Sequence, residues 1–243
     1  MTDVAIERRL MFPVAVGVTA VGLGLLAFVA DLADGIAGQV LIALTSSGLA
    51  WGLAAFLVGR HGGSRRRAAV GGAVLLLTAT LVYYLLVLLL GRRWSGGYLE
   101  DGSSANLHGL RSVTIMAGVW LVGSLVAGPL LALLGHAVRM GTIPRAALAA
   151  GVACGLLSGE GWYALAVRPF WKLDLNDPYR ADFYRGLAVS EVIRVVLPLV
   201  FLAWLAVAHR LGRAWPTLVA ATVSSAAISA LLWYAVGAGA NSI

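Results

Sequence analysis

Residues 68–90 read AAVGGAVLLLTATLVYYLLVLLL, a run of 23 residues without a charged side chain. A transmembrane helix needs about 20 consecutive, mostly apolar residues, so this run is long enough to cross a bilayer. Six further stretches are of similar length and also mostly apolar. The predicted membrane helices comprise residues 11–30, 37–59, 68–90, 112–135, 146–166, 189–208 and 216–238. Because no run alternates apolar and polar residues as a membrane β-strand does, the sequence predicts an all-α polytopic bundle.

The composition supports this fold. Hydrophobic residues make up 60% of the 243 residues and charged residues only 12%, whereas a soluble domain carries about 25% charged residues. Outside the seven runs only two longer loops remain, 91–111 and 167–188. We therefore expect one transmembrane domain over residues 1–243. The loop 167–188, which contains several aromatic residues, is expected to fold onto the outer mouth of the bundle.

The net charge of +7 comes mainly from arginines in short turns between the apolar runs. This distribution is typical of membrane orientation signals and of contacts with anionic lipid, and it does not indicate a nucleic-acid partner. Cys154 is the only cysteine, so no disulfide forms within the chain. The four histidines show no HxxxH or HExxH spacing, and we expect no metal site and no cofactor.

The arginines also predict how the chain lies in the membrane. With the N-terminus in the cytoplasm, ten basic residues are inside and seven outside, a bias in the direction of the positive-inside rule. The inside residues are Arg8, Arg9, Arg60, Arg65, Arg66, Arg67, Arg139, Arg145, Arg210 and Arg213. The C-terminus is then outside. The first apolar run could be mistaken for a signal peptide, but its 20 residues favour an uncleaved helix.

The last six predicted helices form three similar hairpins. Each hairpin has a basic inner turn, beginning near Arg60, His136 or His209, and an aromatic outer end. Parallel repeats of this kind occur in transporters. Any membrane hairpin has basic inner ends and aromatic outer ends, however, so the pattern has a purely topological alternative.

Three ionisable residues interrupt the apolar runs: Glu160, Glu191 and Arg194. Such groups cost about 2.5–3.5 kcal/mol each at the centre of a membrane helix, and they mark functional sites for this reason. The predicted helix bounds place all three in the outer half of the membrane, where they could meet. Glu160 lies between Gly159 and Gly161, which remove side-chain bulk so that a ligand could reach the backbone.

Each of these residues also has a structural interpretation. Glu160 could bind a cation, exchange a proton, or simply form an ion pair with Arg194 or Arg168. Glu191 and Arg194 are three residues apart on one helical face and could form an ion pair at a helix N-terminus. Alternatively, Arg194 faces the bundle and binds an anionic group.

Aromatic side chains gather at the same predicted depth. Those included in the candidate binding site are Tyr83, Tyr84, Trp120, Trp162 and Tyr163. An interfacial aromatic belt is the simpler interpretation, and an apolar cavity with a few polar anchors is the functional one. The hydroxyls of residues 45–47 are expected to bond to carbonyls in the preceding helical turn.

Small residues stand at helix-packing spacings, most clearly in the GxxxG sequence Gly151–Gly155. In lipid, such residues allow two helix backbones to approach closely. The sequence favours packing within this bundle, with self-association of the chain as the alternative.

The stretch Leu44–Arg60 resembles a recurring segment of small actinobacterial multi-pass membrane proteins of unknown function. The segments Tyr83–Tyr84, Gly128–Pro129 and 159–163 (GEGWY) are similar to later parts of the same group. The resemblance covers the second to fifth predicted helices. It implies a protein of the bacterial cytoplasmic membrane and carries no activity.

Three functions are compatible with these features. The first is binding or transport of a small molecule at an outward-facing polar and aromatic site. The second is a membrane-embedded enzyme that acts on a lipid or isoprenoid, with Glu160 as general acid or base. The third is an accessory subunit that packs against a partner in a membrane complex. The sequence leaves open whether the protein is an enzyme.

Overall fold

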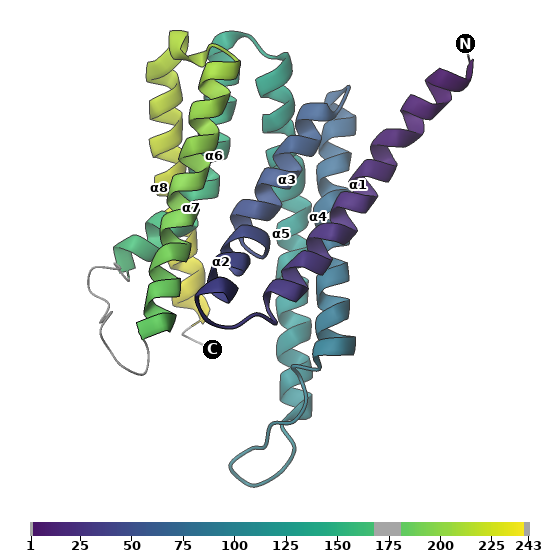
Figure 1. Ribbon diagram of the computed structural model, residues 1–243, viewed down its shortest axis with the longest axis vertical. Coiled ribbons are helices and arrows are strands. Elements are labelled where there is room, and N and C mark those ends of the chain that lie inside the picture. The colour runs from purple at the N-terminus through teal and green to yellow at the C-terminus, as the bar shows by residue number, and fades with distance from the viewer. Residues whose placement is uncertain (1, 168–180, 241–243) are drawn as a thin grey trace.

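The computed structural model describes residues 2–167 and 181–240, and this part of the chain forms an elongated helical bundle without an extended β-strand (Figure 1). The helices are α1 (Thr2–Ala30), α2 (Gly35–Thr45), α3 (Gly48–His61), α4 (Arg65–Leu86), α5 (Asn106–Met140), α6 (Ile143–Val167), α7 (Ala181–Ala208) and α8 (Trp215–Ala240). A π-helical turn, Val87–Gly91, follows α4, and a 3₁₀ turn, Leu211–Ala214, precedes α8. The predicted all-α fold is confirmed.

Six segments within the described residues are long and apolar enough to cross a membrane. They are Met11–Ala30, Gly35–His61, Arg65–Gly91, Asn106–Met140, Ala181–Ala208 and Leu211–Ala238. The predicted run 146–166 is helical and forms α6, but it is not among these six segments, because many small residues and Glu160 lower its mean hydropathy. Helix α6 packs against α3, α5, α7 and α8. Because protein rather than lipid surrounds much of its surface, α6 does not need large apolar side chains on every side.

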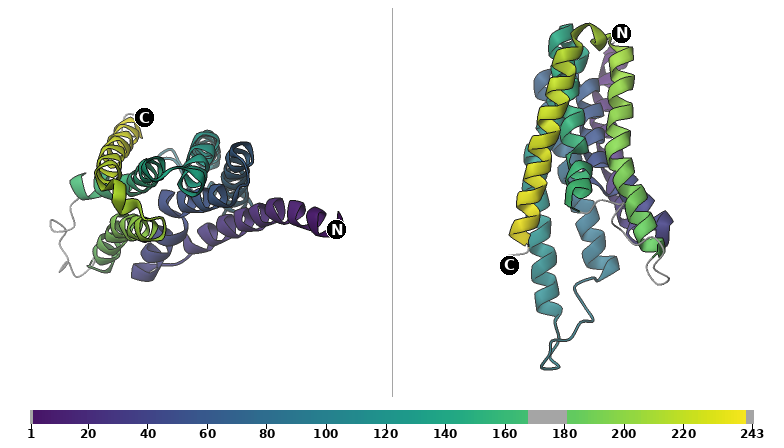
Figure 2. Two further views of the ribbon diagram at one scale, coloured as in Figure 1. Left: turned by 90° about the horizontal axis from the view of Figure 1, so that it is seen from above. Right: turned by 90° about the vertical axis from the view of Figure 1, so that its left-hand side faces the viewer.

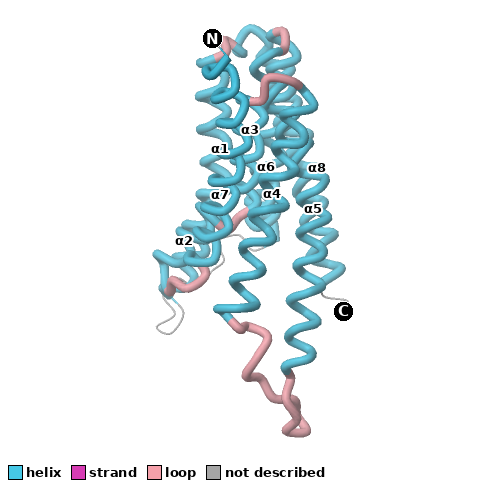
Figure 3. The backbone as a smooth tube through the Cα atoms, turned by 90° about the vertical axis from the view of Figure 1, so that its right-hand side faces the viewer, coloured by secondary structure: helices cyan, strands magenta, loops and turns pink. Residues whose placement is uncertain are grey.

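The chain passes back and forth along the long axis of the bundle, so α1 begins at one end and α8 finishes at the other (Figure 1). Figure 2 shows that α1 leans away from the other helices towards its N-terminus. The loop 92–105, between the π-helical turn and α5, extends beyond the opposite end (Figure 3). The turns at residues 60–67, 139–145 and 209–214 share one end, which we call the basic end.

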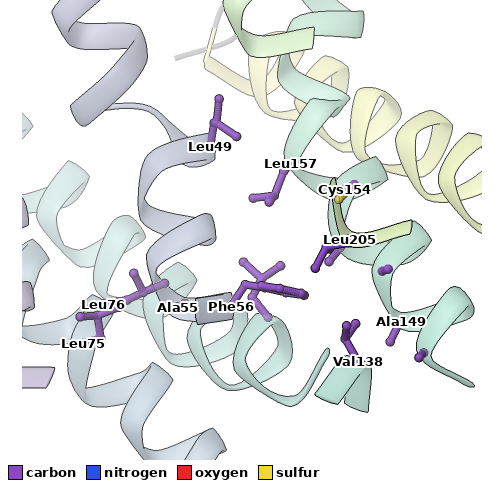
Figure 4. Packing of buried hydrophobic residues seen from close by; sticks show 14 of the residues in the cluster. Leu49, Ala55, Phe56, Leu75, Leu76, Val138, Ala149, Cys154, Leu157 and Leu205 are labelled. Carbon is purple, nitrogen blue, oxygen red and sulfur yellow. The ribbon is translucent and has the colours of Figure 1, made fainter. Parts of the chain in front are cut away.

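The interior of the bundle is a cluster of buried apolar side chains. In Figure 4, Phe56 of α3 lies between Leu76 of α4 and Leu205 of α7, and all three belong to the buried cluster. The Phe56 ring packs edge-on against Phe201 of α7, with the ring centroids 5.6 Å apart. Helix α3 therefore joins the half of the molecule around α4 and α5 to the half around α6 and α7.

Glycines allow α3, α4 and α5 to touch through their backbones. A Cβ atom at Gly59 would overlap the carbonyl group of Ala132, and one at Gly135 would overlap the carbonyl oxygen of Phe56. Gly72 and Gly128 face each other in the same way between α4 and α5. Dispersion contacts are strongest at such short separations, and lipid supplies no hydrophobic force between helices, so these close approaches hold the bundle together.

The GxxxG sequence lies in the contact between α6 and α8. A Cβ atom at Gly151 would lie 2.6 Å from the Leu218 carbonyl oxygen, and one at Gly155 would overlap the Ser225 hydroxyl. The hydroxyl of Ser229 donates a hydrogen bond of 2.9 Å to the carbonyl oxygen of Leu156 across the same contact. Packing within the bundle, the interpretation that the sequence favours, is therefore confirmed.

The three predicted hairpins do not share one packing arrangement. Helix α4 packs more extensively against α5, in the next hairpin, than against α3 in its own. Helices α7 and α8 both pack against α6 and make little contact with each other. The hairpins are therefore not the packing units of the bundle, and an origin by duplication stays a prediction.

Several helices are longer than the predicted runs, for example α1, which starts at Thr2, and α5, which spans Asn106–Met140, and two further differences affect the site. The single helix expected over 37–59 is broken at residues 46–47 into α2 and α3. The helix expected to start at 189 starts at Ala181, because the polar residues before 189 form two more helical turns, with an ion pair between Asp182 and Arg185 at 3.7 Å. Polar residues lower the hydropathy of a segment without preventing a helix.

Arginines dominate the charge of the basic end. Arg139 donates a 3.0 Å hydrogen bond to the Arg60 carbonyl, and the Arg60 guanidinium lies 5.0 Å from the ring centre of Trp204. Burial, and secondly the positive charge of Arg60, lower the pKa of His209 below its usual value. His209 is therefore uncharged at neutral pH, and the positive charge here belongs to the arginines.

Candidate functional site

The break between α2 and α3 lies near the midpoint of the crossing Gly35–His61. Ser47 shapes this break, because its hydroxyl donates to the Ala43 carbonyl (2.6 Å) and accepts from the Ala50 amide (3.5 Å). Ser47 thereby closes the last turn of α2 and caps the first turn of α3. Irregular backbone at membrane depth occurs only where it is buried in protein or lines a cavity.

Trp51 fixes the other side of the break. Its indole N–H donates a 2.9 Å hydrogen bond to the carbonyl oxygen of Thr45, the last residue of α2. The hydroxyl of Thr45 donates to the Leu41 carbonyl at 2.7 Å, as predicted for the hydroxyls of this segment. The polar groups around the break are therefore held by local side chains, and its geometry is well defined.

A cavity of about 250 Å³ lies beside the break, between α3, α4 and α5. Its wall combines four aromatic residues, Trp51, Tyr83, Tyr84 and Trp120, with four hydroxyl residues, Ser46, Ser47, Thr80 and Ser124. Leu76, Ala127, Leu131 and three glycines complete the lining. A mostly apolar cavity with a few polar groups is the usual form of a small-ligand site.

The aromatic side chains of the wall support one another. Tyr83 packs edge-on against Trp51 and against Tyr84, with ring centroids 6.4 Å and 5.1 Å apart. Trp120 lies 6.4 Å from Trp233 of α8. Edge-on and tilted pairs of this kind stabilise each other by about 0.5–1.5 kcal/mol beyond the area they bury. The cavity therefore has a preformed wall.

Two polar contacts fix α4 against its neighbours around the cavity. The hydroxyls of Thr80 and Ser124 are hydrogen-bonded at 2.9 Å between α4 and α5. The hydroxyl of Tyr83 donates a 2.5 Å hydrogen bond to the Asp31 carboxylate at the end of α1. Arg93 forms an ion pair with the same carboxylate at 3.2 Å. The part of the cavity wall farther from the basic end is thus tied to α1 and to the loop 92–105.

Glu160 and Arg194 form an ion pair between α6 and α7, with Arg194 Nη1 3.2 Å from Glu160 Oε1. Their side chains are only 21% and 17% exposed. The neighbouring Gly161 allows the close approach, since a Cβ atom there would lie 2.7 Å from Val195 and 3.1 Å from Arg194. Of the two partners that the sequence suggests for Glu160, Arg194 is the one observed, and Arg168 lies outside the described residues.

The other oxygen of Glu160 faces the helix break. A Cβ atom built on Gly48, the first residue of α3, would lie 3.7 Å from Glu160 Oε2 and 3.9 Å from the Trp233 ring. Gly48 also lines the cavity. The Glu160 carboxylate therefore lies next to one residue of the cavity lining and beside the positive N-terminal end of α3, where a negative charge is favoured.

Glu191 does not occupy the predicted helix N-terminus. It lies ten residues inside α7, is 2% exposed, and is engaged in an interaction rather than free. The preceding Ser190 hydroxyl donates to the Leu187 carbonyl at 2.8 Å and caps no helix. Arg194 lies near the midpoint of α7, so the predicted position of these residues within two turns of the outer end is wrong.

Trp162 and Tyr163 lie away from the cavity. Trp162 is 43% exposed, and Tyr163 packs against Tyr234 of α8 with the ring centroids 6.5 Å apart. Neither residue lines the cavity. The structure therefore brings together Tyr83, Tyr84 and Trp120 at the cavity and Glu160 and Arg194 beside it. The loop residues 168–180, expected at the outer mouth, lie outside the described residues.

The sequence did not identify Asp31, Trp51 or the hydroxyl pair Thr80 and Ser124 as site residues. Asp31 and Tyr83 are 52 residues apart, and Thr80 and Ser124 are 44 apart. Only Trp51 had a local signal, since it follows the polar segment 45–47 by one helical turn. Among the described residues, no three His, Cys, Asp or Glu side chains gather as metal ligands would.

A helix break, an aromatic cavity and a partly buried ion pair thus meet at one place in the bundle. Their residues come from helices α2 to α7, so no short stretch of sequence contains the site. No protein-family model matches the chain, and no curated protein or solved structure is significantly similar to it.

Proposed function

We propose that this integral membrane protein binds a small molecule in the cavity beside the α2–α3 break and carries it across the membrane. The observation that carries the proposal is the break itself, because its irregular backbone lines a preformed aromatic cavity near the middle of a crossing. Transporters build their substrate sites from discontinuous helices at this depth. The adjoining ion pair adds charged groups that could respond to an occupant.

The two alternatives receive less support. An enzyme with Glu160 as general acid or base requires a carboxyl group that is free to exchange a proton, whereas Glu160 is paired with Arg194. An accessory subunit requires no cavity. The cavity and the break therefore favour a binding protein or transporter over both.

Access to the cavity tests this proposal. Ser46, which lines the cavity, is replaced by cysteine, and labelling by neutral methyl methanethiosulfonate is followed by mass spectrometry. We expect the new cysteine to be labelled and Cys154, which is fully buried, to remain unreactive as an internal control. A small-molecule filtrate of a cell extract should slow the labelling, by about tenfold if a ligand is present at ten times its Kd.

A matched pair of glycine variants controls this experiment. Gly123 and Gly118 both lie on α5 with nothing within 4 Å of an added Cβ atom, but only Gly123 lines the cavity. Gly123→Phe should fill the cavity and block labelling at position 46, whereas Gly118→Phe should not. If the introduced cysteine of Ser46→Cys does not react, or if it is labelled equally in the Gly123→Phe and Gly118→Phe variants, a ligand-accessible cavity is refuted.

We also propose that the protein lies in the bacterial cytoplasmic membrane with the basic end in the cytoplasm. The arginines at residues 60–67, 139–145 and 209–213 support this orientation through the positive-inside rule. In intact cells, a membrane-impermeant maleimide should label Ser103→Cys in the loop 92–105 and should not label Gly63→Cys in the α3–α4 turn. The reverse pattern would invert the topology. Cys154 is buried and contributes no background.

A further inference from the structure

We propose that the cavity selects a small organic cation, such as a primary or quaternary ammonium group with compact apolar substituents. This inference rests on the proposed function and specifies the chemistry of its ligand. The volume of about 250 Å³ has room for roughly ten non-hydrogen atoms. Three features support a cation: the aromatic wall, the Glu160 carboxylate beside Gly48, and the N-terminal end of α3, which this carboxylate already faces.

The wall of the cavity is rich in electrons. Four aromatic residues line it, and among the described residues no Arg, Lys or His does. An ammonium group near the face of a Trp or Tyr ring is attracted by the ring quadrupole, most strongly when both are shielded from water. The hydroxyl of Tyr83 also donates a hydrogen bond to the Asp31 carboxylate, and this increases the electron density of the Tyr83 ring.

A carboxylate, that of Glu160, lies next to one residue of the cavity lining. Arg194 binds Oε1 of Glu160, while Oε2 points towards Gly48 at the cavity wall. Oε2 is therefore the Glu160 oxygen on the side of Gly48, and its negative charge would favour a cation in the cavity. The hydroxyl groups of Thr80 and Ser124 can accept hydrogen bonds from an ammonium group.

An anionic ligand fits less well. The N-terminal end of α3 is the feature of the wall that would attract an anion most directly. Glu160 already supplies a carboxylate at that end, 3.7 Å from the Cβ position of Gly48. A second anion would be repelled by this charge.

The experiment compares choline with its neutral carbon isostere, in which a tert-butyl group replaces the trimethylammonium group. Full-length Ser46→Cys protein is placed in nanodiscs of neutral lipid, and each compound is tested for slowing methyl methanethiosulfonate labelling. Choline should protect the cysteine at a concentration at least about tenfold lower than the isostere requires. The corresponding tert-butyl carboxylate should protect least.

Two tryptophans of nearly equal exposure provide a matched control for the cation preference. Trp120 lines the cavity and is 42% exposed, whereas Trp162 is 43% exposed and lies away from it. Trp120→Leu should reduce the preference for choline, and Trp162→Leu should leave it unchanged. Both variants also carry Ser46→Cys, so labelling of the introduced cysteine without any compound reports whether the cavity has remained open.

The outcomes separate the two proposals. Equal protection by choline and the isostere, or protection by neither while the cysteine is labelled normally, overturns cation selection and leaves the accessible cavity intact. A cysteine that no reagent labels overturns the cavity itself. Protection by choline that persists equally in both tryptophan variants shows that the cation binds elsewhere, and it too overturns the inference.

Discussion

Gly59→Ala will prevent the bundle from packing. The new methyl group would overlap the backbone of Ala132, including its carbonyl oxygen and Cα atom, and a backbone cannot rotate away as a side chain can. Helices α3 and α5 would have to separate along their whole contact, which also includes Gly135 against Phe56. Because overpacking costs about 1–3 kcal/mol even where side chains can adjust, we expect a loss above this range.

Size-exclusion chromatography in mild detergent and thermal unfolding measure this effect. Gly59→Ala should give little monodisperse protein and a strongly lowered Tm. Gly118→Ala is the matched control, because no atom lies within 4 Å of its added Cβ and alanine favours a helix by up to about 1 kcal/mol. Similar Tm values for the two variants would show that α3 and α5 are not in backbone contact.

Removing one member of the Glu160–Arg194 pair will destabilise the protein more than removing both. Arg194→Met leaves a carboxylate with 21% exposure in the bundle and without its observed partner. Fully buried pairs lose about 3–5 kcal/mol on such a change, and we expect about 2–4 kcal/mol here because water reaches both side chains in part. The combined Glu160→Gln and Arg194→Met variant should return to within about 1 kcal/mol of the natural protein.

A double-mutant cycle of unfolding free energies checks this prediction. The i,i+3 pair Asp182–Arg185 on the same helix α7 is the control, since its side chains are 78% and 52% exposed. Breaking that pair should change the unfolding free energy by no more than about 0.5 kcal/mol. If the effects of Glu160→Gln and Arg194→Met simply add, the two residues are not coupled and the ion pair has no structural role.

The helices themselves were predictable because each depends on a local property. A run such as 68–90 has no alternative to helix in a bilayer, where every backbone amide must find a partner within its own segment. The ends were less predictable. Residues 181–188 are polar enough to resemble a loop, yet they extend α7, because hydropathy reports the surroundings of a helix and not its hydrogen bonds.

The break in the second crossing was hidden for a related reason. Hydroxyl residues occur in unbroken membrane helices, where they bond to the preceding turn, so residues 45–47 did not by themselves indicate an interruption. Thr45 and Ser47 do make such bonds, but the chain also changes direction between them. The indole of Trp51 holds that change by a hydrogen bond from outside the segment, and the carboxylate of Glu160 lies beside Gly48 at its far side.

The sequence alone determined that the protein is an all-α membrane bundle and that Glu160 and Arg194 are costly enough to need each other or a ligand. Only the tertiary structure decided that they pair, that Glu160 faces Gly48, and that Tyr83, Tyr84 and Trp120 form one wall with Trp51. The physical reason is that hydropathy is a sum over neighbours in the chain. A cavity, in contrast, depends on how closely glycines such as Gly59 and Gly161 allow distant helices to approach.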